Sequence, residues 1–222
     1  MRLWLAIFCG ACLAAPAADA GGWLRKKGGG FVSTSNTLTD QLHTKSSFYL
    51  EFGLTAKTTI GVDIDMTLTG LGQTGAGQIF ARRALPLGSA KTVWAYQVGL
   101  GMAFEGVAFA PLAQLGLSYG RSIKLGKYDG WLAVDTSAHW NFGTSVRALK
   151  IDTTAGLTLG ARSKVMMQIF WTADSLGGTS TTLSPSYIYT PKRGKFSYLI
   201  AVESTQSTAA SYGIKAGLWR DF

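Results

Sequence analysis

Apolar residues alternate with small or polar residues through one segment after another of this sequence. In the stretch from 94 to 104 the even positions are large and apolar or aromatic, and the odd positions are alanine, glutamine or glycine. Successive side chains of a β-strand point to opposite faces, so a period of two indicates strands. We count about twelve such segments of roughly ten residues, which is the spacing of a membrane β-barrel. The sequence therefore predicts an all-β, antiparallel up-and-down barrel of about twelve strands.

Three of these segments alternate weakly and leave the strand count open between about ten and fourteen. They cover residues 31–39, 76–85 and 181–190, and Pro185 interrupts the last of them. An even count places both ends of the chain on the same side of the barrel.

Alternation alone would also fit a soluble sandwich, whose apolar face points inward. Two observations favour lipid on the apolar face instead. The polar faces carry mostly Gly, Ser, Thr, Gln and Asn, where a water-facing surface would carry many Lys and Glu. Aromatic residues also gather at strand ends, as they do at membrane interfaces. The expected interface aromatics are Trp94, Trp131, Trp140, Tyr187, Tyr189, Phe196, Tyr198 and Tyr212.

The first twenty residues have the three parts of a secretory signal peptide: Arg2, an apolar run at 3–15, and small residues around Ala18-Asp19-Ala20. The apolar run is shorter than the ~20 residues that a membrane-spanning helix needs. We expect cleavage after Ala20, with lipidation at Cys12 as a weaker alternative. Both cysteines lie in this segment, so the mature chain would contain none. The expected organisation is a signal peptide at 1–20, an N-terminal periplasmic or lumen arm at 21–30 and a barrel at 31–222.

The signal, the alternating segments and the terminal Phe222 together resemble a Gram-negative outer-membrane β-barrel protein of the small, porin-like kind. The stretch 51–62 is similar to hairpins common in small barrels of that class. The resemblance implies an outer-membrane location, two periplasmic termini, outer-membrane lipids as partners, and recognition of Phe222 by the barrel-assembly machinery. Arg220 departs from the pattern, because such proteins more often carry an apolar or aromatic residue there. No single functional family is indicated.

Charged residues on the polar faces are the candidates for a lumen or selectivity role. They are Glu51, Asp63, Asp65, Arg82, Glu105, Asp135, His139, Asp152, Asp174 and Glu203. We expect Arg82 roughly opposite Asp63, with Glu51 as a diagonal neighbour. These residues could form a network that satisfies buried charges, or a vestibule that attracts cations. The arm, with Trp23, could also enter the lumen and narrow it.

Basic residues dominate the charge, which is +9 for the chain. Export makes nucleic acid an improbable partner, so no nucleic-acid binding is expected. With both termini periplasmic, most lysines and arginines fall on the periplasmic turns. Basic residues there can meet anionic headgroups, and an acidic periplasmic partner is the alternative.

The sequence favours a narrow, water-filled channel for small solutes, and the inward acids point to cations. The alternatives are a structural or assembly-associated barrel without a through-pore, and a lipid-modifying enzyme. The enzyme is disfavoured because residues two apart on a strand, such as Ser137 and His139, are ~7 Å apart, too far for a direct hydrogen bond. No cofactor or metal is expected.

Overall fold

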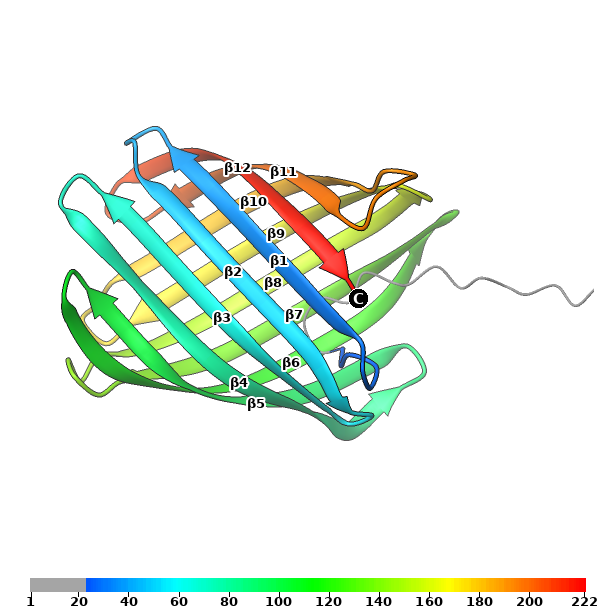
Figure 1. Ribbon diagram of the computed structural model, residues 1–222, viewed down its shortest axis with the longest axis horizontal. Coiled ribbons are helices and arrows are strands. Elements are labelled where there is room, and N and C mark those ends of the chain that lie inside the picture. The colour runs from blue at the N-terminus through cyan, green and yellow to red at the C-terminus, as the bar shows by residue number, and fades with distance from the viewer. Residues whose placement is uncertain (1–22) are drawn as a thin grey trace, which may run out of the picture.

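Twelve antiparallel strands form the described part of the chain, residues 23–222, in a computed structural model (Figure 1). Each strand pairs with the next in sequence, and the pairing of the first strand with the last closes the barrel. This confirms the predicted twelve-stranded, all-β barrel. The strands are β1 (Gly30–Thr39), β2 (Thr44–Thr55), β3 (Thr58–Thr69), β4 (Gly72–Ser89), β5 (Thr92–Glu105), β6 (Ala108–Leu125), β7 (Tyr128–Asn141), β8 (Arg147–Gly160), β9 (Ser163–Asp174), β10 (Thr179–Tyr189), β11 (Ser197–Gln206) and β12 (Ala210–Asp221).

The three weakly alternating segments are all strands. β4 is longer than expected and runs through to Ser89. Pro185 leaves a gap in one ladder: β10 pairs with β11 at Leu183 and again at Ser186, with no partners in between. Proline has no N–H to donate, so it interrupts a sheet ladder in this way. The predicted signal segment, 1–20, lies outside the described residues. Within residues 23–222, no helix is long and apolar enough to cross a membrane.

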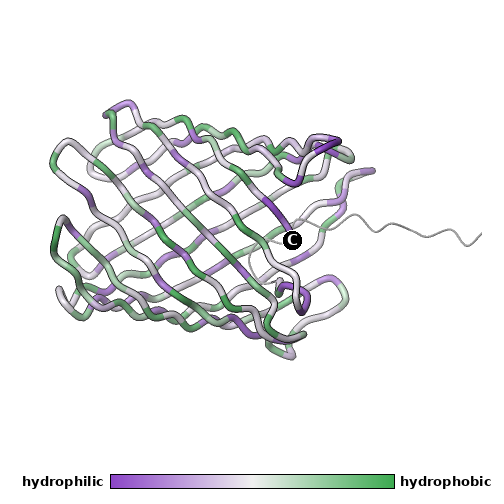
Figure 2. Tube along the Cα trace, in the orientation of Figure 1, coloured by the Kyte–Doolittle hydropathy of each residue, from purple (hydrophilic) through white to green (hydrophobic). Residues whose placement is uncertain are grey.

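Large apolar side chains cover the outside of the barrel. Leu100 is 67% exposed and Ile214 is 68% exposed, while the inward Gln97 on the same strand as Leu100 is 8% exposed. Figure 2 shows hydrophilic and hydrophobic residues alternating along the strands. A soluble sandwich would bury its large aliphatic residues between two sheets. The single closed sheet with an apolar exterior is therefore the form suited to lipid.

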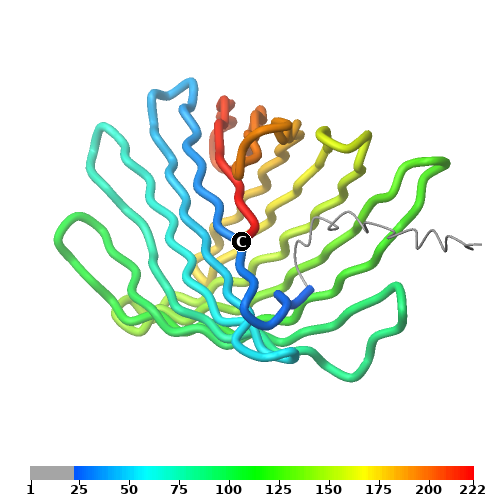
Figure 3. Tube along the Cα trace, turned by 45° about the vertical axis from the view of Figure 1, so that its right-hand side comes forward, coloured from blue at the N-terminus to red at the C-terminus, as the bar shows by residue number. Residues whose placement is uncertain are grey.

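Short turns join the strands at both ends (Figure 3). Gly106 and Gly126 each open a two-residue turn with positive φ, 57° and 58°, a backbone conformation that glycine adopts without a Cβ penalty. The longest connection, 190–196, joins β10 to β11. We call the end where β1 starts and β12 finishes the terminal end, and the other the opposite end. The connections at the opposite end are short, none longer than the stretch 142–146.

Backbone bonds and an aromatic contact close the seam between β1 and β12. Gly30 and Phe222 exchange backbone hydrogen bonds of 2.7 and 3.0 Å. The Phe222 ring lies so close to Gly30 that a Cβ on this glycine would overlap it. The C-terminal aromatic residue thus packs at the point where the barrel closes.

Asp40, in the turn between β1 and β2, ties the opposite end of this seam. The pKa of Asp40 is lowered chiefly by the hydrogen bond from the Tyr212 backbone N–H, with the Ser211 hydroxyl adding to it against a desolvation cost. A carboxyl with a lowered folded pKa stabilises the fold above its unfolded pKa and loses that contribution as pH falls through the folded value.

We expect Asp40→Asn to speed hydrogen exchange at the Tyr212 amide at pH 7 and to have little effect near pH 2. An equal effect at both pH values would contradict this role.

Candidate functional site

The inward faces of the strands enclose a cavity of about 590 Å³. Its wall carries hydroxyl, amide and charged side chains from near the opposite end, where Lys45 and Thr67 lie, to near the terminal end, where Ser197 and Asp221 lie. Because alternate residues of every strand point inward, small polar residues such as Ser35 line it. The barrel therefore holds a polar interior along most of its length.

Most of the predicted lumen residues are on this wall. Those that line the cavity are Glu51, Asp63, Asp65, Arg82, Asp135, Asp152 and Glu203. Glu105 and Asp174 lie at the opposite rim instead. Glu105 is exposed at the last position of β5. The Asp174 carboxylate accepts the backbone N–H groups of Leu176 and Gly178 and so holds the turn after β9.

A buried ion network occupies the terminal end of the lumen. Glu51 is 2% exposed, and its carboxylate accepts hydrogen bonds from Arg25 at 2.6 Å and from Arg82 at 2.5 Å. The Tyr49 hydroxyl donates to the same carboxylate at 2.5 Å, and Arg82 also donates to the Gln97 carbonyl at 2.9 Å. Glu51 thus serves two guanidinium groups at once, one from β4 and one from the N-terminal arm.

The expected pairing of Arg82 with Asp63 is wrong. In the observed register Arg82 lies opposite Thr59, and Asp63 lies opposite Gln78. The turn between β3 and β4 is tight, which shifts the partner of Asp63 by four residues along β4. Arg82 instead reaches Glu51, the predicted diagonal neighbour, across β3. Gly61, the β3 partner of Glu51, has no side chain to block this approach.

Both signs of charge meet in the middle of the lumen. Asp135 and Asp152 are direct cross-strand partners, an arrangement that is unfavourable for like charges. Lys150 lies two residues from Asp152 on the same inward face, and electrostatic interactions link it to Asp152 and to the acids of β3. A second ion pair joins Lys215 to Glu203 at 3.1 Å.

More basic residues line the cavity than the sequence predicted. Lys45 and Lys164 both line the cavity, whereas most lysines were expected on the turns. The signal that could have placed them is parity, since each lies an even number of residues from an inward residue of its own strand. Acids and bases on the cavity wall are consequently almost balanced. The lining bases are Arg25, Lys45, Arg82, Lys150, Lys164 and Lys215.

His139 differs from the expectation in its contacts. Its Nε2 lies 2.9 Å from the Ser137 hydroxyl, so the expectation that the two residues are too far apart to bond is wrong. The Cα spacing along a strand is unchanged, but both side chains lean along the strand and meet. The His139 side chain is buried, at 9% exposure. Among residues 23–222, no group of three or more His, Cys, Asp or Glu side chains could hold a metal ion.

Trp131 was expected at a membrane interface and that expectation is wrong. It is 4% exposed and packs inside the barrel with Met166, Ile188 and Leu199. Odd positions of β7 point inward, as Asp135 does, so Trp131 shares the inward face. Its partly buried neighbours in this cluster include Trp23 of the N-terminal arm.

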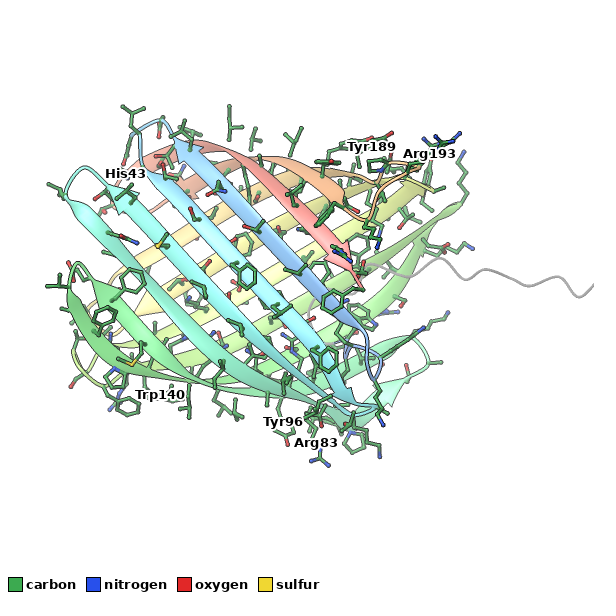
Figure 4. All side chains as sticks on the ribbon, viewed as in Figure 1. His43, Arg83, Tyr96, Trp140, Tyr189 and Arg193 are labelled. Carbon is green, nitrogen blue, oxygen red and sulfur yellow. The ribbon has the colours of Figure 1, made fainter. Side chains whose placement is uncertain are left out.

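The other predicted interface aromatics lie on strands and turns at the two ends of the barrel. Figure 4 shows Trp140 pointing outward near the opposite end and Tyr189 near the terminal end. Trp94 contacts Tyr119 on the outer face, with ring centroids 4.8 Å apart. Tyr187, Phe196 and Tyr198 are exposed near the terminal end, and Tyr212 near the opposite end.

Exposed basic residues crowd the terminal end. In Figure 4, Arg83 projects outward beside Tyr96, and Arg193 lies at the same end of the barrel. The exposed acids there are Asp129, which pairs with Lys124 at 3.8 Å, and Asp221. The exposed bases at this end are Lys26, Lys27, Lys57, Arg83, Lys91, Arg121, Lys124, Lys127, Lys192, Arg193 and Lys195.

Comparison with solved structures shows that this is the fold of small outer-membrane porins and channels. The KdgM porin superposes with a TM-score of 0.62 at 8% identity, covering 86% of this chain and 99% of that one. A COG4313 outer membrane channel from Pseudomonas putida F1 superposes with a TM-score of 0.62 at 12% identity, covering 94% and 100%.

A second structure of the KdgM porin, in complex with disordered oligogalacturonate, has a TM-score of 0.57 at 9% identity, over 86% of this chain and 99% of that one. No protein-family model matches the sequence, and no curated protein matches it either. The fold is therefore the one seen in outer-membrane porins and channels.

Proposed function

We propose that this protein is a narrow channel for small polar solutes in the outer membrane. The observation that supports it most is the polar cavity, whose lining runs from Lys45 near one end to Asp221 near the other. A barrel that served only as a scaffold could fill this space with apolar side chains. Hydroxyl, amide and charged groups keep water there and replace part of the hydration shell of a passing solute.

The proposed selectivity is a weak preference for cations. Asp63, Asp65, Asp135 and Asp152 face the middle of the lumen with Lys150 among them. Carboxylates in a pore favour cations, and the nearby lysine reduces the effect. The near balance of acids and bases on the wall argues for modest selectivity.

The proposed placement has both termini in the periplasm. The crowded bases of the terminal end would then meet phospholipid headgroups, at about 1 kcal/mol for each basic residue near an anionic surface. Export would use the predicted signal segment at 1–20, and the β12 strand ending in Phe222 would be the signal for the barrel-assembly machinery.

Recording from planar bilayers tests the channel. We expect steps of conductance, a reversal potential in a KCl gradient that favours K⁺, and a shift towards zero selectivity in Asp63→Asn/Asp65→Asn. The conservative double variant removes two charges and keeps the side-chain volume. Absence of conductance would rule the channel out, and a clear preference for Cl⁻ in the wild type would rule out the proposed selectivity.

A barrel without a through-pore is the second candidate function. The packed terminal end favours it, since Trp131 and Ile188 are almost fully buried inside the lumen. Vesicles containing such a barrel would not swell in isotonic solutions of small sugars, whereas vesicles containing an open channel would.

A further inference from the structure

The N-terminal arm, residues 23–29, folds back into the terminal end of the barrel. Its backbone pairs with β2: Lys27 bridges to Gly53, Gly28 donates to the Gly53 carbonyl at 2.8 Å, and the Gly53 N–H donates to Gly29 at 2.9 Å. Further in, the Arg25 N–H donates to the Thr59 hydroxyl at 2.9 Å, and its side chain is 9% exposed and bonded to Glu51. The arm is thus held by backbone and charge on the β2–β3 side.

Trp23 extends the arm to another part of the wall. Its ring lies against Gly120 of β6, so close that a Cβ on this glycine would come within 2.6 Å of it. β6 is four strands round the barrel from β2. Between these two contacts the arm crosses the lumen at its terminal end.

The wall is shaped to receive this tryptophan. Met166, Ile188 and Leu199 form an apolar cluster on the inner wall and are between 2% and 4% exposed. Apolar side chains facing a water-filled passage would lose the benefit of burial. Trp23 packs against this cluster and supplies that burial, together with Trp219. Gly120 leaves space for the ring on the other side.

We propose that residues 23–27 close the terminal end of the channel and must leave the lumen before solutes can pass. This inference rests on the proposed channel function. Trp23 in the apolar cluster and Arg25 on Glu51 attach the arm through side chains, and the contacts with Gly53 and Thr59 attach it through the backbone. Because the twelve strands close the barrel without the arm, release of the arm would open the passage without unpairing the barrel wall.

Three full-length variants displace the arm in different ways. Gly53→Ala places a methyl group against the Arg25 and Lys26 carbonyl oxygens, and Gly120→Ala places one in the Trp23 ring. Trp23→Ala removes the ring without any clash. Gly77→Ala is the matched control, since its Cβ would meet only Ile64 at an ordinary 3.6 Å.

Conductance in planar bilayers is the first readout. We expect openings to become about tenfold more frequent or more in the three arm variants, because loss of a buried tryptophan contact shifts a two-state equilibrium by at least that factor. Gly77→Ala should match the wild type. Gly120→Ala should add nothing in the Trp23→Ala background, because the ring it displaces is absent. If the Gly53→Ala variant does not insert into the bilayer, the conductance of Trp23→Ala provides the test of the closure.

Trypsin cleavage in the arm is the second readout and does not depend on conduction. Cutting after Arg25, Lys26 or Lys27 requires the segment to leave β2, so the wild type should resist and the arm variants should be cut. Cleaved variants that conduct no more than the wild type would overturn the closure and leave the channel standing. If trypsin cuts the variants but neither the variants nor the wild type conducts, both the proposed channel and the proposed closure are overturned. Variants that resist trypsin and conduct like the wild type would show that the Trp23 contact does not control release of the arm, which would overturn the proposed closure.

Discussion

Replacing Glu51 with glutamine is expected to destabilise the folded barrel by about 3–5 kcal/mol, the cost of removing one partner from a buried ion pair. Glu51 is the carboxylate shared by Arg25 and Arg82, at 2.6 and 2.5 Å. Glutamine has nearly the same volume, so the loss would come from two guanidinium groups that no longer have an anion between them. Arg25 would keep its longer ion pair with Asp221, at 3.5 Å.

Urea titration of the barrel in lipid vesicles, followed by tryptophan fluorescence, measures this loss. Glu203→Gln is the matched control, because it makes the same chemical change in the ion pair of Glu203 with Lys215, where the two charged groups are 3.1 Å apart and the side chain of Lys215 is 17% exposed. We expect the control to lose clearly less stability. If the two variants lost equal free energy of unfolding, the contact of Glu51 with two arginines would contribute no more to stability than the ion pair of Glu203 with Lys215.

Replacing Leu115 with lysine is expected to cost about 2–4 kcal/mol of folding free energy in a bilayer, the range for a basic residue on the lipid face near the midplane. Leu115 is 53% exposed on the outer face of β6, with Val98 and Ala138 as its partners on the neighbouring strands. A lysine there would bring its charge into hydrocarbon, where no water can solvate it.

Gln114→Lys, one residue away, is the control for Leu115→Lys. Gln114 lines the cavity, so a lysine at this position would enter the lumen, where other charged side chains also lie. We expect a small change in stability for this variant in the same vesicle titration. A larger loss for Gln114→Lys than for Leu115→Lys would show that the faces of β6 are assigned the wrong way round.

Several site features were readable from the sequence, and some were missed although they were readable. The inward direction of Glu51, Asp63 and Asp135 follows from parity within their strands. The same rule applied to β7 places Trp131 inside, so this error came from treating an aromatic residue near a strand end as an interface residue. The side-chain contact of Ser137 with His139 could not be judged from Cα spacing, because it depends on how both side chains lean.

The sequence by itself determined the strand segments and their outer face, because a period of two is a local property of consecutive residues. It left the number of strands open between about ten and fourteen, and closure of the sheet fixed it at twelve. Only the tertiary structure decided which charges meet. The Arg25–Glu51–Arg82 network joins an arm, β2 and β4, and it depends on turn lengths that set the register between strands. A change of a few residues in one turn would bring other residues together while leaving the alternation intact. The seat of Trp23 at Gly120 has the same origin, since closure of the sheet brings β6 within reach of the chain's beginning.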